Sequence, residues 1–99
     1  MADTDFPDPW FGVTDAALAE FLKVELERAV SERHLLWGAS VKVLARSKAA
    51  DDVLFAVKGR AFALAEVHLT FTGKREADPR WPRTAVFADL ESWRQSLAD

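Results

Sequence analysis

The chain has 99 residues, of which 49% are hydrophobic and 29% are charged, a composition typical of one globular domain rather than of a disordered chain. It contains no cysteine, which excludes disulfides and thiolate chemistry, and it has neither a signal-peptide pattern nor an apolar run near the roughly 20 residues of a membrane span. The net charge of −3 disfavours general binding to nucleic acid.

The first predicted elements are an arm and a helix. Residues 1–12 are rich in Asp and Pro, which predicts an irregular arm. A helix is expected over residues 14–33, because Thr14 is a favourable N-cap and apolar residues then recur at helical spacing. The apolar face of this helix consists of Leu18, Phe21, Leu22, Leu26 and Ala29.

Glu25 interrupts that apolar face, and a buried carboxylate is costly unless it is paired. Three interpretations stay open: the side chain reaches the edge of the face, it bonds Arg28 one turn later, or it belongs to a polar site. His34 follows the helix and is expected to be solvated.

Three strands are predicted next, over residues 40–46, 52–58 and 61–72. Gly59 and Arg60 are expected to form a two-residue hairpin turn. This register pairs Val57 with Phe62, Phe55 with Leu64, and Val53 with Glu66. The face of the sheet under the helix would then consist of Val41, Val43, Val53, Phe55, Val57, Phe62 and Leu64.

In the C-terminal third, the sequence predicts a basic loop (residues 73–84). A helix follows, for which Asp89 is a plausible N-cap. Residues 84–87 would form a short fourth strand if the helix begins at Asp89. The predicted fold class is therefore α+β in one domain over residues 1–99. It has an N-terminal helix, an antiparallel sheet of three or four strands in meander order, and a C-terminal helix.

The basic loop is the first candidate binding site, with Arg75, Arg80, Trp81 and Arg83 as its candidate residues. Two prolines flank Arg80 and Trp81 and hold this segment extended. We expect Trp81 to point inward as a cover for the second face of the sheet, with the arginines outside. If Trp81 is exposed instead, the loop becomes the leading binding site, suited to an acidic partner.

Glu66 and His68 form the second candidate site. In the predicted register they continue the row under the helix, near Glu25. These three side chains would suit a divalent metal or an acid–base pair, although their sequence spacing matches no metal-binding motif. The alternative is a histidine that bonds a carboxylate where the core meets water.

Several segments together resemble a family of small uncharacterised bacterial proteins. The segments are DDVLFAV, VHLTFTGK, RWP, VF and LESW, within residues 35–95. The matching positions are Asp51, Asp52, His68, Leu69, Thr70, Gly73, Trp81, Pro82, Phe87, Leu90 and Trp93. Phe71 stands where the family has a tryptophan. The resemblance implies a bacterial, cytosolic protein and no particular activity.

The sequence therefore favours a small cytoplasmic interaction module that binds another protein without catalysis, as an accessory or immunity-type protein would. The contact would be the acidic helix face, with Glu20 and Glu27, or the basic loop. No cofactor, membrane or nucleic-acid partner is expected. The alternative is a small enzyme or metal-dependent ligand binder built on Glu25, Glu66 and His68.

Overall fold

A computed structural model of the protein describes residues 6–98. Its elements are β1 (Trp10–Gly12), α1 (Ala16–Ala29), β2 (Ser40–Ser47), β3 (Asp52–Lys58), β4 (Leu64–His68), β5 (Thr84–Phe87) and α2 (Leu90–Leu97). The strands form one antiparallel sheet in sequential order, so the α+β meander is confirmed. The sheet has five strands rather than three or four, because part of the predicted irregular arm forms β1 at one edge. No described helix is long and apolar enough to cross a membrane.

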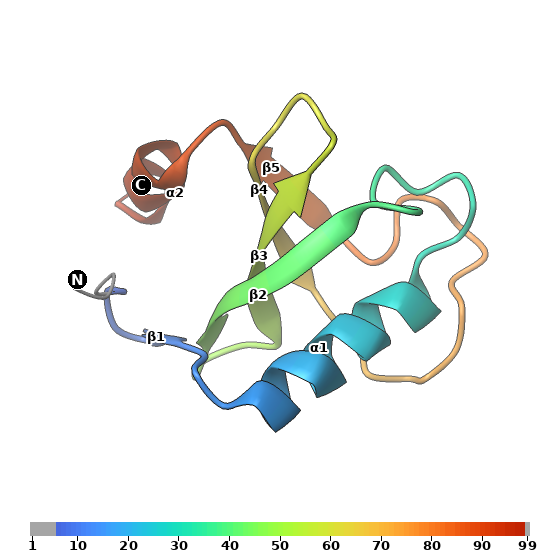
Figure 1. The fold of residues 1–99 in the computed structure, drawn as a ribbon, viewed down its shortest axis with the longest axis horizontal. Coiled ribbons are helices and arrows are strands. Elements are labelled where there is room, and N and C mark those ends of the chain that lie inside the picture. The colour runs from blue at the N-terminus through green and yellow to red at the C-terminus, as the bar shows by residue number, and fades with distance from the viewer. Residues whose placement is uncertain (1–5, 99) are drawn as a thin grey trace.

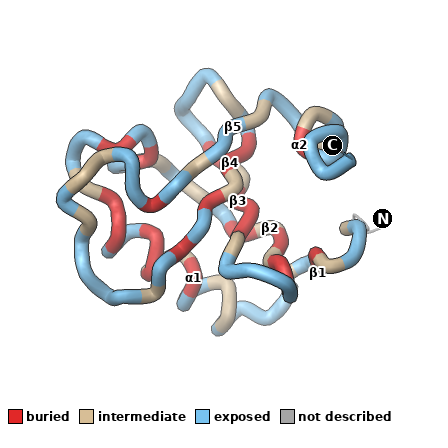
Figure 2. Tube along the Cα trace, turned by 180° about the vertical axis from the view of Figure 1, so that it is seen from behind, coloured by how far each residue is buried: buried red, intermediate tan, exposed pale blue. Residues whose placement is uncertain are grey.

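The sheet separates two apolar layers. Figure 1 shows α1 lying along one face of the sheet. We call the face under α1 the inner face and the opposite one the outer face. The inner layer consists of Leu22, Leu26, Val30, Leu36, Val43, Val53, Phe55, Val57, Ala65, Val67 and Leu69. The outer layer consists of Trp10, Ala45, Leu54, Leu64 and Trp93. Figure 2 shows the buried segments gathered on the central strands and on α1.

Helix α1 is shorter at both ends than the predicted helix over residues 14–33. Asp15 is the N-cap in place of Thr14, because its carboxylate accepts from two helix amides and carries the charge that suits a helix N-terminus. The helix ends at Ala29, where the basic loop satisfies its last carbonyls. The amide of Glu76 donates to Ala29 O at 2.9 Å and Arg75 Nε donates to Val30 O at 3.1 Å.

The predicted register of β3 with β4 is wrong by one residue. Phe55 pairs with Ala65 and Leu54 with Glu66, so the connection is one residue longer than a two-residue turn. A slip of one residue moves a whole strand's side chains to the other face. In the observed register Ala65, Val67 and Leu69 enter the inner layer, and polar residues of β4 face outward. The observed register buries the apolar residues of β4, whose sequence alternates between apolar and polar residues.

A β-bulge in β2, between Val43 and Ala45, is a second departure from the predicted face. Val43 stays in the inner layer, but Ala45 joins the outer layer. The bulge therefore supplies a small side chain to the outer layer, beside Trp10.

One end of the outer face is covered by the two ends of the described chain, and the prediction that Trp81 covers this face is wrong. The indole of Trp93, on α2, is fully buried and meets Trp10 and Phe6 edge to face at centroid distances of 5.1 and 5.8 Å. Helix α2 begins after Asp89, whose carboxylate accepts from Ser92 N, and β5 precedes it, as predicted for a fourth strand.

Candidate functional site

The corrected register places three charged or titratable side chains in one row across the outer face. Asp52 on β3 pairs with His68 on β4, and the amide of His68 donates to Arg83 O at 2.9 Å. The next row holds Glu66 beside Ala85 of β5. Trp93 and Trp10 cover the outer layer further along the strands, so these two rows stay open to solvent.

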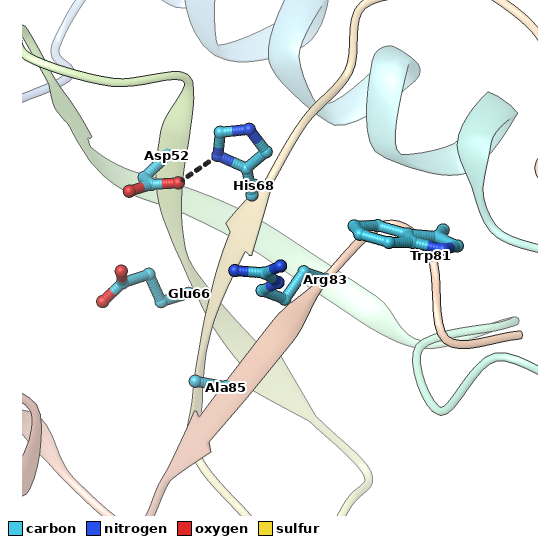
Figure 3. A pocket seen from close by; sticks show the side chains of 6 residues that line it. All are labelled: Asp52, Glu66, His68, Trp81, Arg83 and Ala85. Atoms are coloured by element: carbon cyan, nitrogen blue, oxygen red, sulfur yellow. Dashed lines mark hydrogen bonds and ion pairs between the residues drawn. The ribbon is translucent and has the colours of Figure 1, made fainter.

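These rows line a pocket of about 390 Å³, within the size range of small-ligand sites. Its lining, which we call the β3–β5 pocket, consists of Asp52, Glu66, His68, Trp81, Arg83 and Ala85. Figure 3 shows Arg83 reaching across β4 between His68 and Glu66, with Trp81 at the far end from the carboxylates. The pocket thus combines two acidic groups, one permanent cation and an aromatic surface.

Asp52 and His68 form a short hydrogen bond, 2.7 Å from Asp52 Oδ1 to His68 Nδ1. Because a carboxylate only accepts, Nδ1 is the donor. This fixes the orientation of the ring and leaves Nε2 on its opposite edge. This pair fits the alternative interpretation given above, in which His68 bonds a carboxylate where the core meets water.

Glu66 is half-buried, and its Oε1 accepts from the indole Nε1 of Trp93 at 2.9 Å. Burial raises the pKa of Glu66, the bond from Trp93 opposes that shift, and the nearby charge of Asp52 adds to it. Glu66 therefore links the aromatic cover of the outer face to the pocket.

Trp81 is 38% exposed, and the Arg83 guanidinium lies 5.5 Å from the centre of its ring. The next residue, Pro82, is the buried anchor of the loop. Pro82 O receives bonds from Thr84 Oγ1 at 2.9 Å and from His34 Nε2 at 3.0 Å. Trp81 is therefore presented to solvent from a fixed position.

His34 is buried, so the expectation that it is solvated is wrong. Its Nδ1 accepts from the amide of Leu36 at 3.0 Å, so Nε2 carries the proton that it donates to Pro82 O. His34 thereby ties the segment after α1 to the basic loop, across 48 positions of sequence.

The other predicted site residues lie outside the pocket. Glu25 is buried on α1, on the inner side of the sheet, with Arg28 Nη1 at 3.8 Å from its Oε2, in line with the interpretation of a pair one turn apart. Arg75 lies at the end of α1, over the ring of Trp37 at 4.9 Å. Arg80 is exposed and paired with Asp78, whose pKa this guanidinium holds at about 2.

The structure thus brings together Glu66, His68, Trp81 and Arg83 of the predicted residues, and adds Asp52 and Ala85. The signal that would have found Asp52 is the register, because Asp52 faces His68 only once β4 is shifted by one residue. Among residues 6–98, no group of three His, Asp or Glu side chains is arranged to hold a metal ion.

Comparison of the chain with protein-family models, with curated proteins and with solved structures finds no match in any of the three.

Proposed function

We propose that the protein is an interaction module that acts in the cytoplasm and binds another protein through the β3–β5 pocket, with Trp81 and Arg83 as its main contact residues. The observation that carries this proposal is an exposed indole beside a pocket, on a stretch of backbone that hydrogen bonds hold in place. Trp and Arg are the residue types most enriched among those that dominate binding energy at protein interfaces. Burying the exposed third of one indole would contribute about 2 kcal/mol.

Preorganisation of the loop supports the same proposal. The amide of Trp81 donates to Asp78 O at 3.0 Å, and Pro82 is anchored by His34 and Thr84. Ordering a side chain on binding costs free energy, and a side chain that is already held in place avoids part of that cost.

Trp37 offers a matched control for the test of this proposal. It is also 38% exposed, and it also carries a stacked guanidinium, that of Arg75. It lies at a different pocket, beside the end of α1.

The experiment is affinity capture from a lysate of the source organism with wild-type, Trp81→Ala and Trp37→Ala proteins. We expect one protein to be retained by wild type and Trp37→Ala and lost with Trp81→Ala. Calorimetry with that purified partner should show binding about 30-fold weaker for Trp81→Ala. Equal retention by Trp81→Ala, or selective loss with Trp37→Ala, would contradict the proposal.

A second candidate function, a small enzyme, is favoured by the Asp52–His68 hydrogen bond. A carboxylate that holds Nδ1–H leaves Nε2 as a general base, and Glu66, with its raised pKa, could supply a proton. In such an enzyme, Asp52 would be the carboxylate beside His68, the role that the sequence predicted for Glu25. Turnover of a substrate that disappears in His68→Asn, with the fold intact, would favour the enzyme over the interaction module.

A further inference from the structure

Strand β5 is one edge of the sheet, and its free edge carries unpaired peptide groups. In an antiparallel ladder the peptide groups of successive residues face opposite neighbours. The amide of His68 donates to Arg83 O and the amide of Ala63 donates to Phe87 O, so Arg83, Ala85 and Phe87 face β4. The N–H and C=O groups of Thr84 and Val86 therefore point away from the sheet. No hydrogen bond outside the ladder uses them within residues 6–98.

Two of the four β5 residues are exposed, and Thr84 is half-buried. Val86 is 41% exposed and Ala85 is exposed. Short edge strands and nearby prolines limit uncontrolled pairing between edges, and β5 has four residues and follows Pro82. Such an edge still offers four main-chain groups to one added strand.

The pocket lies directly beside this edge, on the outer face. A strand that bonds Thr84 and Val86 would place the residue between its two bonded positions opposite Ala85, with its side chain on the outer face. The next outward side chain along the added strand would lie opposite Arg83. Both side chains would border the β3–β5 pocket.

The charge of Arg83 determines which type of side chain the added strand should have opposite it. Arg83 takes part in no ion pair of the described residues, its guanidinium lies 5.5 Å from the centre of the Trp81 ring, and it shares the pocket with the carboxylates of Asp52 and Glu66. A carboxylate opposite Arg83 would form a charge-assisted pair on an aromatic surface. A cation at that position would face Arg83 as a like charge.

We propose that β5 receives an extended segment of the partner protein as a sixth strand of the sheet, and that an Asp or Glu side chain of this segment pairs with Arg83 beside Trp81. This inference rests on the proposed function and adds the partner's chemistry: an extended, acidic segment.

The test uses a display library of short random peptides and the full chain. The enriched peptides should alternate in apolar character and share one acidic position. A synthetic copy of such a peptide should bind wild type, and Arg83→Gln should weaken this binding about tenfold or more. Lys42→Gln, which removes an exposed cation on β2, should leave it unchanged. A library without peptides that depend on Arg83 would overturn the proposal.

The main-chain part of the proposal is tested from both sides of the interface. Val86→Pro removes an N–H that points outward and leaves the bonds between β5 and β4 in place. Methylating the peptide at the amide that faces β5 removes one bond without altering the protein. Each change should weaken binding about tenfold. If the methylated peptide binds wild type as tightly as the parent peptide, strand addition is wrong.

Failure of this inference differs from failure of the proposed function. Peptides that require Trp81 but tolerate Val86→Pro and main-chain methylation would overturn strand addition and leave the interaction module standing. Peptides whose binding requires neither Trp81 nor the free edge of β5 would contradict both strand addition and the proposed function. A dimer in sedimentation that Val86→Pro dissociates would show that a second copy occupies the edge, and would overturn the acidic partner.

Discussion

Two exposed tryptophans illustrate how similar residues differ in what surrounds them. Trp37 and Trp81 are equally exposed and each has a guanidinium over its ring. Arg75, over Trp37, also donates to a carbonyl at the end of α1, so it has a structural role. Arg83, over Trp81, makes no such bond within residues 6–98 and lines the β3–β5 pocket. This contrast is why Trp37→Ala is an informative control.

Single-residue patterns predicted the wrong burial for His34 and Trp81. His34 and Trp81 were both assigned to the wrong environment, and one contact explains both errors. His34 bonds Pro82 O, which buries the histidine and fixes Pro82 inside, so the neighbouring indole lies outside. No local pattern encodes a contact across 48 positions.

Glu66→Gln tests the electrostatics of the pocket. Burial raises the pKa of Glu66 above 4.5, so protonated Glu66 stabilises the fold below that pH, and this contribution is lost as pH rises through the folded pKa. Gln cannot ionise, yet its amide oxygen can still accept from Trp93. We expect Glu66→Gln to become more stable relative to wild type as pH rises from acid to neutral, as measured by urea unfolding. A stability difference independent of pH would show that Glu66 is not perturbed by burial.

At the scale of elements, alternation in β4 was a better guide to register than turn chemistry. The two-residue turn at Gly59 and Arg60 would put Glu66 and His68 under α1. The observed register places them on the outer face instead, and Arg60 contributes to the longer connection by bonding Leu35 O and Trp37 O. Because all side chains of a strand move together, this one error put both Glu66 and His68 on the wrong face.

The position of α1 was predicted well, because helical periodicity and the β3 alternation agree on one apolar face. Phe55 is fully buried there, with Leu22 and Leu26 of α1 in the same cluster. Phe55→Ala should cost about 3–5 kcal/mol in the free energy of unfolding, as a cavity in a packed core. Chemical denaturation is the measurement, and Phe62→Ala, at a partly buried position, should cost less. A loss below about 1 kcal/mol for Phe55→Ala would mean that α1 packs elsewhere.

At the scale of the whole molecule, the two faces of the sheet have different uses. The inner face is closed by α1 and forms the larger core cluster. The outer face is closed at one end by the aromatic cluster of Trp10 and Trp93 and open at the other, where the pocket lies. The sequence predicted the meander and both helices, but not this division, because it depends on long-range contacts between the two ends of the described chain.

We propose that a partner binds at the open end of the outer face. The most direct measurement is an NMR titration of the isotope-labelled full chain with the protein captured in the Trp81 experiment. We expect the shifted amide signals to cluster at Asp52, Glu66, His68, Trp81 and residues 83–87. Shifts confined to the acidic face of α1, around Glu20 and Glu27, with Trp81 and residues 83–87 unmoved, would contradict the proposal.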